Sequence, residues 1–193
     1  MNIISRVINI ATKPKNEWPV IAAESATVQS IFTGFIMPLA AIGPVCGFIQ
    51  SLMFTSALGF RPPVGLLFVS MIVGYLLTLA GVFILAFIVD KLAPTFQSSG
   101  GMVQALKLVA YAQGPVWVAG VLGLIPFLGI LTIFVGLYCL YIIYLGFTPV
   151  MNTPPEKVVP YLVVVIIVAI IVWVVIGLIT ASIVTVGALT GSI

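Results

Sequence analysis

The 193-residue chain is 62% hydrophobic and only 6% charged, against about 25% charged in an ordinary soluble domain. A soluble domain of this size exposes most of its surface to water, so the composition excludes one and places much of the chain in lipid. The net charge is +3, but the basic residues do not form a stripe along the sequence. The absence of such a stripe excludes a nucleic-acid partner. There is no histidine, and the only cysteines are Cys46 and Cys139. We therefore expect no His-based catalytic or metal site, no zinc site and no cofactor.

The chain is expected to divide into a cytoplasmic N-terminal segment, residues 1–28, and a membrane domain, residues 29–193. Residues 1–12 have the 3.6-residue periodicity of an amphipathic helix. Its apolar face holds Ile3, Ile4, Val7, Ile8 and Ala11, and its polar face holds Asn2, Ser5, Arg6 and Asn9. A dozen residues are too few to cross a bilayer, so this helix is expected to lie on the membrane surface and to end at Pro14.

A hinge is expected at residues 13–24, where four of the eleven charged residues cluster. Lys13 and Lys15 are expected to face anionic headgroups, and Trp18 to lie at the membrane interface. Glu17 is grouped with them as an interfacial residue whose partner the sequence leaves open.

Five membrane-spanning helices are expected, because each segment supplies about 20 apolar residues. They cover about 29–54, 64–89, 105–125, 129–150 and 158–179. Pro38 and Pro44 should bend the first span. The charge-free run from Leu108 to Pro155 is long enough for two crossings, with a tight hairpin at residues 125–129. A four-span alternative would leave one charge-free run outside the membrane and would scatter the basic residues.

Five spans place nearly all basic residues on one side of the membrane. That side holds Arg6, Lys13, Lys15, Lys91, Lys107 and Lys157. The opposite side holds only Arg61, in the predicted first loop. The positive-inside rule makes the first side cytoplasmic, which leaves the C-terminus outside.

Polar groups within the spans are the candidates for function. Tyr111, Gln113, Gly114 and Pro115 form the most interesting stretch, because the proline frees a backbone carbonyl and the glycine lets a neighbour approach. One interpretation is a polar break in the helix that binds a substrate or ion, as in transporters with discontinuous spans. The interpretation we favour is a kinked helix in which Gln113 bonds to a neighbouring backbone.

Asp90 lies at the end of the second span, beside Lys91. A structural ion pair between Asp90 and Lys107 across the following loop is the favoured interpretation. A proton-coupling carboxylate at Asp90 is the alternative.

Three stretches together resemble the Yip family, small polytopic membrane proteins named for interaction with Ypt/Rab GTPases. They are RVINIATKPKNEWPVIAAE (6–24), YAQGPVWVAGVLGLIPFLGIL (111–131) and GLYCLYIIYLGFTPVMNTPPEKVVPYLVVV (136–165). They look like the prokaryotic branch, in which an arginine-led amphipathic helix and a Pro-x-x-x-Trp segment precede five spans. The resemblance implies a location in the prokaryotic cytoplasmic membrane. The long cytosolic domain and the acidic-aromatic motif of the eukaryotic relatives are not matched here, so no GTPase-binding residue is carried over.

The expected fold is therefore an all-α integral membrane protein with five spans and an N-terminal interfacial helix. The leading functional hypothesis is a non-enzymatic membrane organiser or adaptor. It would bind lipid or another membrane protein through its cytoplasmic face. Another copy of the same chain, in a homo-oligomer, is a further candidate partner. The alternative is a small oligomeric transporter or channel that uses the predicted break around Gln113, Gly114 and Pro115.

Overall fold

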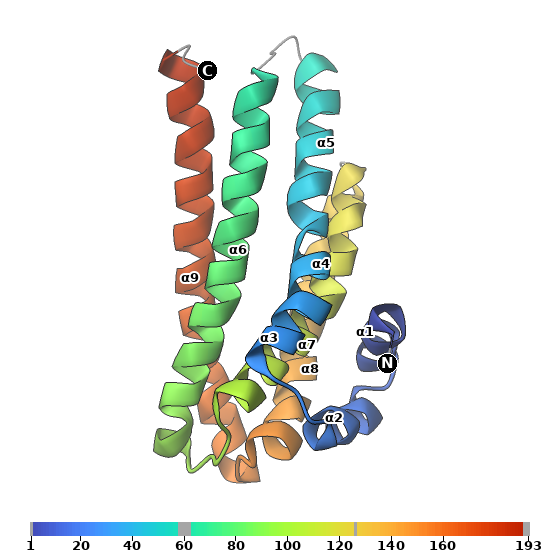
Figure 1. Cartoon of the computed structure of the whole chain (residues 1–193), viewed down its shortest axis with the longest axis vertical. Coiled ribbons are helices and arrows are strands. Elements are labelled where there is room, and N and C mark those ends of the chain that lie inside the picture. Colours follow the sequence, from blue (N-terminus) through green and yellow to red (C-terminus); the bar gives the residue numbers. More distant parts are fainter. Residues whose placement is uncertain (1, 58–62, 126, 191–193) are drawn as a thin grey trace.

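The computed structural model describes residues 2–57, 63–125 and 127–190, with the side chains of 54–57, 184 and 186–190 left out. Within these residues the regular structure is entirely helical (Figure 1). Five helical segments are long and apolar enough to cross a membrane: Val28–Met53, Val64–Phe96, Met102–Leu124, Leu128–Met151 and Pro155–Ile183. Each begins close to its predicted start, which confirms the all-helical, five-span prediction with a short N-terminal helix.

The helices follow one another with short connections. Their bounds are α1 Ile3–Thr12, α2 Pro14–Ala23, α3 Val28–Ile31, α4 Met37–Ala40, α5 Ile42–Ala57, α6 Val64–Leu92, α7 Met102–Ala119, α8 Leu131–Met151 and α9 Pro155–Thr190. A π-helical turn at Phe32–Ile36 joins α3 to α4, and 3-10 turns occupy Ala93–Phe96, Gly120–Leu124 and Leu128–Ile130. The predicted hairpin, residues 125–129, starts after the turn at Gly120–Leu124 and ends within the turn at Leu128–Ile130. Its Pro126 is outside the described residues, as are Arg61 and Pro62.

The first span is an interrupted helix, as its two prolines predicted. Thr27 and Ser30 begin it with reciprocal side-chain-to-backbone caps. The π-helical turn then precedes Pro38, whose ring cannot donate the usual backbone hydrogen bond. Nearby, the carbonyl of Met37 accepts a hydrogen bond of 3.1 Å from the hydroxyl of Tyr75 in α6. A neighbouring span therefore stabilises the backbone where the helix is irregular.

Helix α7 is the centre of the bundle and packs against α6, α8 and α1, whereas α9 packs mainly along α6 (Figure 1). Most of the apolar stretch of α7 is buried inside the protein, whereas little of the apolar stretches of α8 and α9 is buried. Small side chains on α7, including Ala105, Ala110, Ala112 and Gly114, allow this close approach from several sides. Residues of α7 therefore contact the N-terminal helices and the first, second and fourth spans.

The N-terminal segment differs from its prediction in two respects. First, α1 ends before Pro14 as expected, but Pro14 then begins a second helix, α2, so the predicted hinge is mostly helical. Second, α1 is packed on α7 with Arg6, Val7 and Ile10 buried, and α2 packs on α8. Arg6 is therefore not exposed with the rest of the predicted polar face, because its side of α1, shared with Val7 and Ile10, is turned towards the bundle.

Candidate functional site

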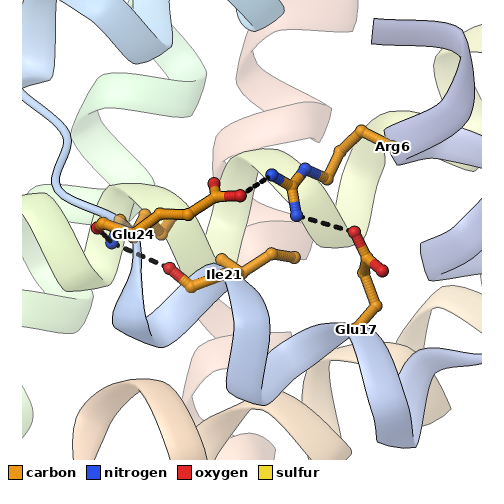
Figure 2. Close-up of polar contacts among 5 residues, drawn as sticks. Arg6, Glu17, Ile21 and Glu24 are labelled. Carbon is orange, nitrogen blue, oxygen red and sulfur yellow. Dashed lines mark hydrogen bonds and ion pairs between the residues drawn. The ribbon is translucent and has the colours of Figure 1, made fainter. Parts of the chain in front are cut away.

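Four charged side chains from three parts of the chain meet where α1 and α2 dock onto the bundle. They are Arg6 of α1, Glu17 of α2 and Glu24 just after α2 (Figure 2), together with Lys107 of α7. We call them the ion network. Two positive and two negative charges balance, so the network as a whole is neutral. Ionisable groups within an apolar chain are expected to pair in this way, because each is costly to bury alone.

Arg6 is the centre of the network. Its Nη1 donates to Oε1 of Glu17 at 2.6 Å, and its Nη2 donates to Oε1 of Glu24 (Figure 2). Arg6 and Glu17 are only 5% and 7% exposed, whereas 40% of the Glu24 side chain is exposed. Burial disfavours the charged guanidinium, but the hydrogen bond to Glu24 and the charges of Glu24 and Glu17 outweigh burial and raise the pKa of Arg6. The guanidinium therefore stays charged.

Lys107 binds the C-terminal end of α2 through hydrogen bonds to its backbone. Its Nζ, on a side chain that is 2% exposed, donates to the backbone carbonyls of Ile21, at 2.8 Å, and Glu24. Helix α2 stops at Ala23, so the carbonyl of Ile21 lacks its usual partner one turn further on. A cation at a helix C-terminus also interacts favourably with the helix dipole. The predicted pair between Asp90 and Lys107 is therefore wrong, because the Lys107 ammonium is held by α2 instead.

Trp18 anchors α2 to α8 and is fully buried. Its indole N–H donates to the carbonyl of Ile142 at 2.8 Å. A Cβ added at Gly146 would lie within 2.8 Å of the Trp18 ring, so only glycine leaves room for it. Trp18 and Glu17 therefore face the bundle rather than lipid, because α2 lies against α8.

Lys13 and Lys15 are exposed, as expected for residues that face headgroups. At the C-terminal end of α1, the Tyr138 hydroxyl of α8 donates to the Ala11 carbonyl at 2.9 Å. Helices α1 and α2 are thus held at several points by α7 and α8. We call residues 2–24 the docked module.

A small polar cavity of about 230 Å³ lies beside the network. Arg6, Glu24 and Tyr111 contribute its polar groups together with Ser25 and Ser30. The Arg6 guanidinium lies 5.5 Å from the centre of the Tyr111 ring, a cation–π contact. Among the described residues no group of three His, Cys, Asp or Glu side chains could hold a metal ion.

The candidate residues Tyr111, Gln113, Gly114 and Pro115 of α7 do not form a single site, because they lie in different surroundings. Tyr111 and Lys107 lie at the network, and Gly114 packs against Phe35, whose Cζ would be 3.0 Å from an added Cβ. Gln113 instead lines an apolar cleft that none of the network residues lines. Helix α7 continues through Pro115 to Ala119, so the predicted break in this span is wrong.

The favoured interpretation of a hydrogen-bonded Gln113 is not found either, since no described residue accepts from or donates to its side-chain amide. Asp90, half-buried at the end of α6, makes no ion pair with any described residue.

Arg6 and Glu24 are the site residues that sequence reasoning missed. Arg6 was assigned to a solvent-facing surface, because periodicity shows which residues share a face but not what covers that face. One signal was present: Arg6, Glu17 and Glu24 are three of only eleven charged residues, carry opposite charges and lie close together in the sequence.

The comparison with protein families gives one match. A family model described as the Yip1 domain matches residues 8–176, which includes three of the four network residues. No curated protein and no solved structure gives a significant match to the chain.

Proposed function

Because this chain belongs to the Yip1 family, whose members are generally non-enzymatic membrane proteins, we propose that it is a membrane organiser or adaptor. It binds lipid or another membrane protein through the docked module. The observation that carries this proposal is a pair of exposed isoleucines on α1, Ile4 and Ile8, which are 66% and 54% exposed.

Helix α1 is apolar on two sides. Val7 and Ile10 are buried in the bundle, while Ile4 and Ile8 lie one turn apart on the outward side. A single exposed apolar residue needs no explanation. A pair on a helix fixed by the ion network and by Tyr138 forms a defined apolar surface, suited to the boundary between headgroups and acyl chains.

Two exposed lysines support a membrane-facing role for the module. Lys13 and Lys15 follow α1 directly and make no ion pair with any described residue. Each can contribute about 1 kcal/mol of attraction to an anionic leaflet. The proposed orientation places the module on the cytoplasmic side, where such lipids are found. A cysteine at position 15 should then react with an impermeant thiol reagent only from that side.

The proposal is tested with a pair of polar substitutions, Ile4→Ser with Ile8→Ser, in protein extracted with its surrounding lipid. The lipids that copurify are identified, and a photoreactive side chain at position 12, where Thr12 is exposed, records neighbours. We expect the unchanged protein to be enriched in anionic lipid or to cross-link to a defined membrane protein. We expect both signals to fall in the double variant.

The matched control is Val64→Ser, which removes an equally exposed apolar side chain, 59% exposed, at the far end of α6. The control should leave lipid composition and cross-links unchanged. The proposal is wrong if the double variant behaves like the control. Solute or ion flux through reconstituted protein would also count against it, and would favour the transporter alternative.

A further inference from the structure

A large apolar cleft lies within the spans, separate from the ion network. Its volume is about 780 Å³, and residues of α4, α5, α6, α7, α8 and α9 line it. Nearly all of its surface is carbon, and none of its lining side chains is charged. Small-molecule and cofactor sites typically measure about 300–1,000 Å³ and are mostly apolar, so the cleft has the size and chemistry of a ligand site.

Two residues of α7 that carry hydrogen-bond donors line the cleft. They are Gln113, with a side-chain amide, and Trp117, with an indole N–H, and they lie one helical turn apart on the same face of the helix. Neither has a hydrogen-bond partner among the described residues. By contrast, the hydroxyl of Thr78, also in the lining, already donates to the carbonyl of Gly74 at 2.8 Å. Two residues that line the cavity therefore carry donors that a bound acceptor could satisfy.

The donors lie deep within the membrane. Gln113 is eleven residues from the start of α7, which corresponds to about 17 Å along the helix axis. The hydrocarbon core is roughly 30 Å thick, so this position is near its middle. A molecule that reaches the donors must arrive through hydrocarbon, and it must offer an acceptor without carrying a charge.

We propose that this cleft binds an uncharged lipid whose apolar chain fills the cavity and whose carbonyl oxygen accepts hydrogen bonds from Gln113 and Trp117. An acyl ester and an isoprenoid-type quinone share this chemistry. A helix of a second protein is a poorer match for unpaired donors, because its backbone carbonyls are already hydrogen-bonded within the helix. An ion is excluded because the lining offers no charge to balance it.

Gly136 provides a way to fill the cleft without disturbing its walls. It lines the cavity, and a Cβ added there meets no atom within 4 Å. Gly136→Phe should therefore extend into the cavity, and Gly136→Leu should fill it partly. Gly177 of α9 is the matched control, because its added Cβ is equally unobstructed and it does not line the cleft. Gly177→Phe adds the same ring outside the cleft.

Tryptophan fluorescence reports occupancy of the cleft. Trp117 and Trp173 line it, whereas Trp18 is buried at the α2–α8 contact and provides a constant background. The probes are three: a methyl ester of a dibrominated fatty acid, decylubiquinone, and a dibrominated alkane without an acceptor. The purified full chain is titrated in detergent, where a non-specific probe quenches in proportion to its concentration and does not saturate.

We expect saturable quenching by the ester, by the quinone or by both, and the probe that binds identifies the source. Gly136→Phe should weaken binding at least tenfold, Gly136→Leu by less, and Gly177→Phe not at all. The alkane should bind about two- to tenfold more weakly than the bound carbonyl probe, and Gln113→Leu should abolish that difference. Non-saturable quenching by both carbonyl probes, or equal binding by the Gly136→Phe and Gly177→Phe proteins, would overturn the proposal.

Discussion

Replacing Arg6 with methionine should detach the docked module from the bundle. Methionine keeps most of the apolar stem but removes the guanidinium that joins α1 to Glu17 and Glu24. Glu17 is only 7% exposed, so the substitution leaves a buried carboxylate without its cation. The unpaired charge, rather than the lost attraction alone, makes this change severe.

The size of the effect follows from the unequal burial of the two carboxylates. Removing one partner of a buried ion pair typically costs about 3–5 kcal/mol, and we assign this to Arg6→Met on the basis of the pair with Glu17. The Glu24 side chain is 40% exposed, so solvent screens its attraction to Arg6. The pair with Glu24 therefore contributes about 1 kcal/mol or less to the loss of stability. We therefore expect the loss to decrease from Arg6→Met to Glu17→Gln to Glu24→Gln.

Detachment can be followed by trypsin cleavage after Lys15 and by the emission of Trp18. Lys15 is exposed, but its bond becomes a good substrate only when α2 unfolds locally. Trp18 is fully buried in the docked state, so its emission should shift to the red on release. Loss of about 3 kcal/mol would raise the population of the detached state by more than a hundredfold.

A double-mutant cycle provides the control. If the pair itself is responsible, Arg6→Met combined with Glu17→Gln should cost less than the sum of the two single changes. Equal cleavage rates for the wild-type and Arg6→Met proteins would refute the reasoning. So would strict additivity, since it would show that the two side chains are not coupled.

Three further substitutions test the contacts around the network. Gly146→Ala should lower stability by about 1–3 kcal/mol, since the added Cβ would lie within 2.8 Å of Trp18; an unchanged melting temperature would contradict the tight contact. Lys107→Met should cost about 1–3 kcal/mol by leaving the carbonyl of Ile21 without its donor, and hydrogen exchange should increase at the end of α2 rather than across the bundle. Asp90→Asn should change the free energy of unfolding by less than about 0.5 kcal/mol, because Asp90 forms no ion pair with Lys107. A larger loss of stability would support the ion pair predicted from the sequence.

The spans were predictable because the signal for them is local. A run such as 158–179 is apolar enough on its own to require lipid, and α9 occupies it with little help from neighbours. The bends of the first span were predictable for the same reason, since Pro38 affects its own helix directly.

The site was only partly predictable because its residues are distant in the chain. Lys107 and Glu17 were recognised as candidates by their charge, but Lys107 was assigned to the wrong partner. The sequence offered Asp90 as the nearest acidic residue across a loop. It gave no measure of how α2 would lie against α7 and α8, which is what brings Lys107 to the end of α2.

Hydropathy and charge alone determined that this protein is a five-span, all-helical membrane protein, because partitioning into lipid is a sum over neighbouring residues. The tertiary structure alone decided which charges meet, that Trp18 is buried against Gly146, and that Gln113 faces an apolar cleft while Tyr111, two residues earlier, faces the ion network. These outcomes depend on the side from which each helix is approached. A helix with apolar residues on several faces does not specify that side, since lipid and a neighbouring helix satisfy such faces almost equally well.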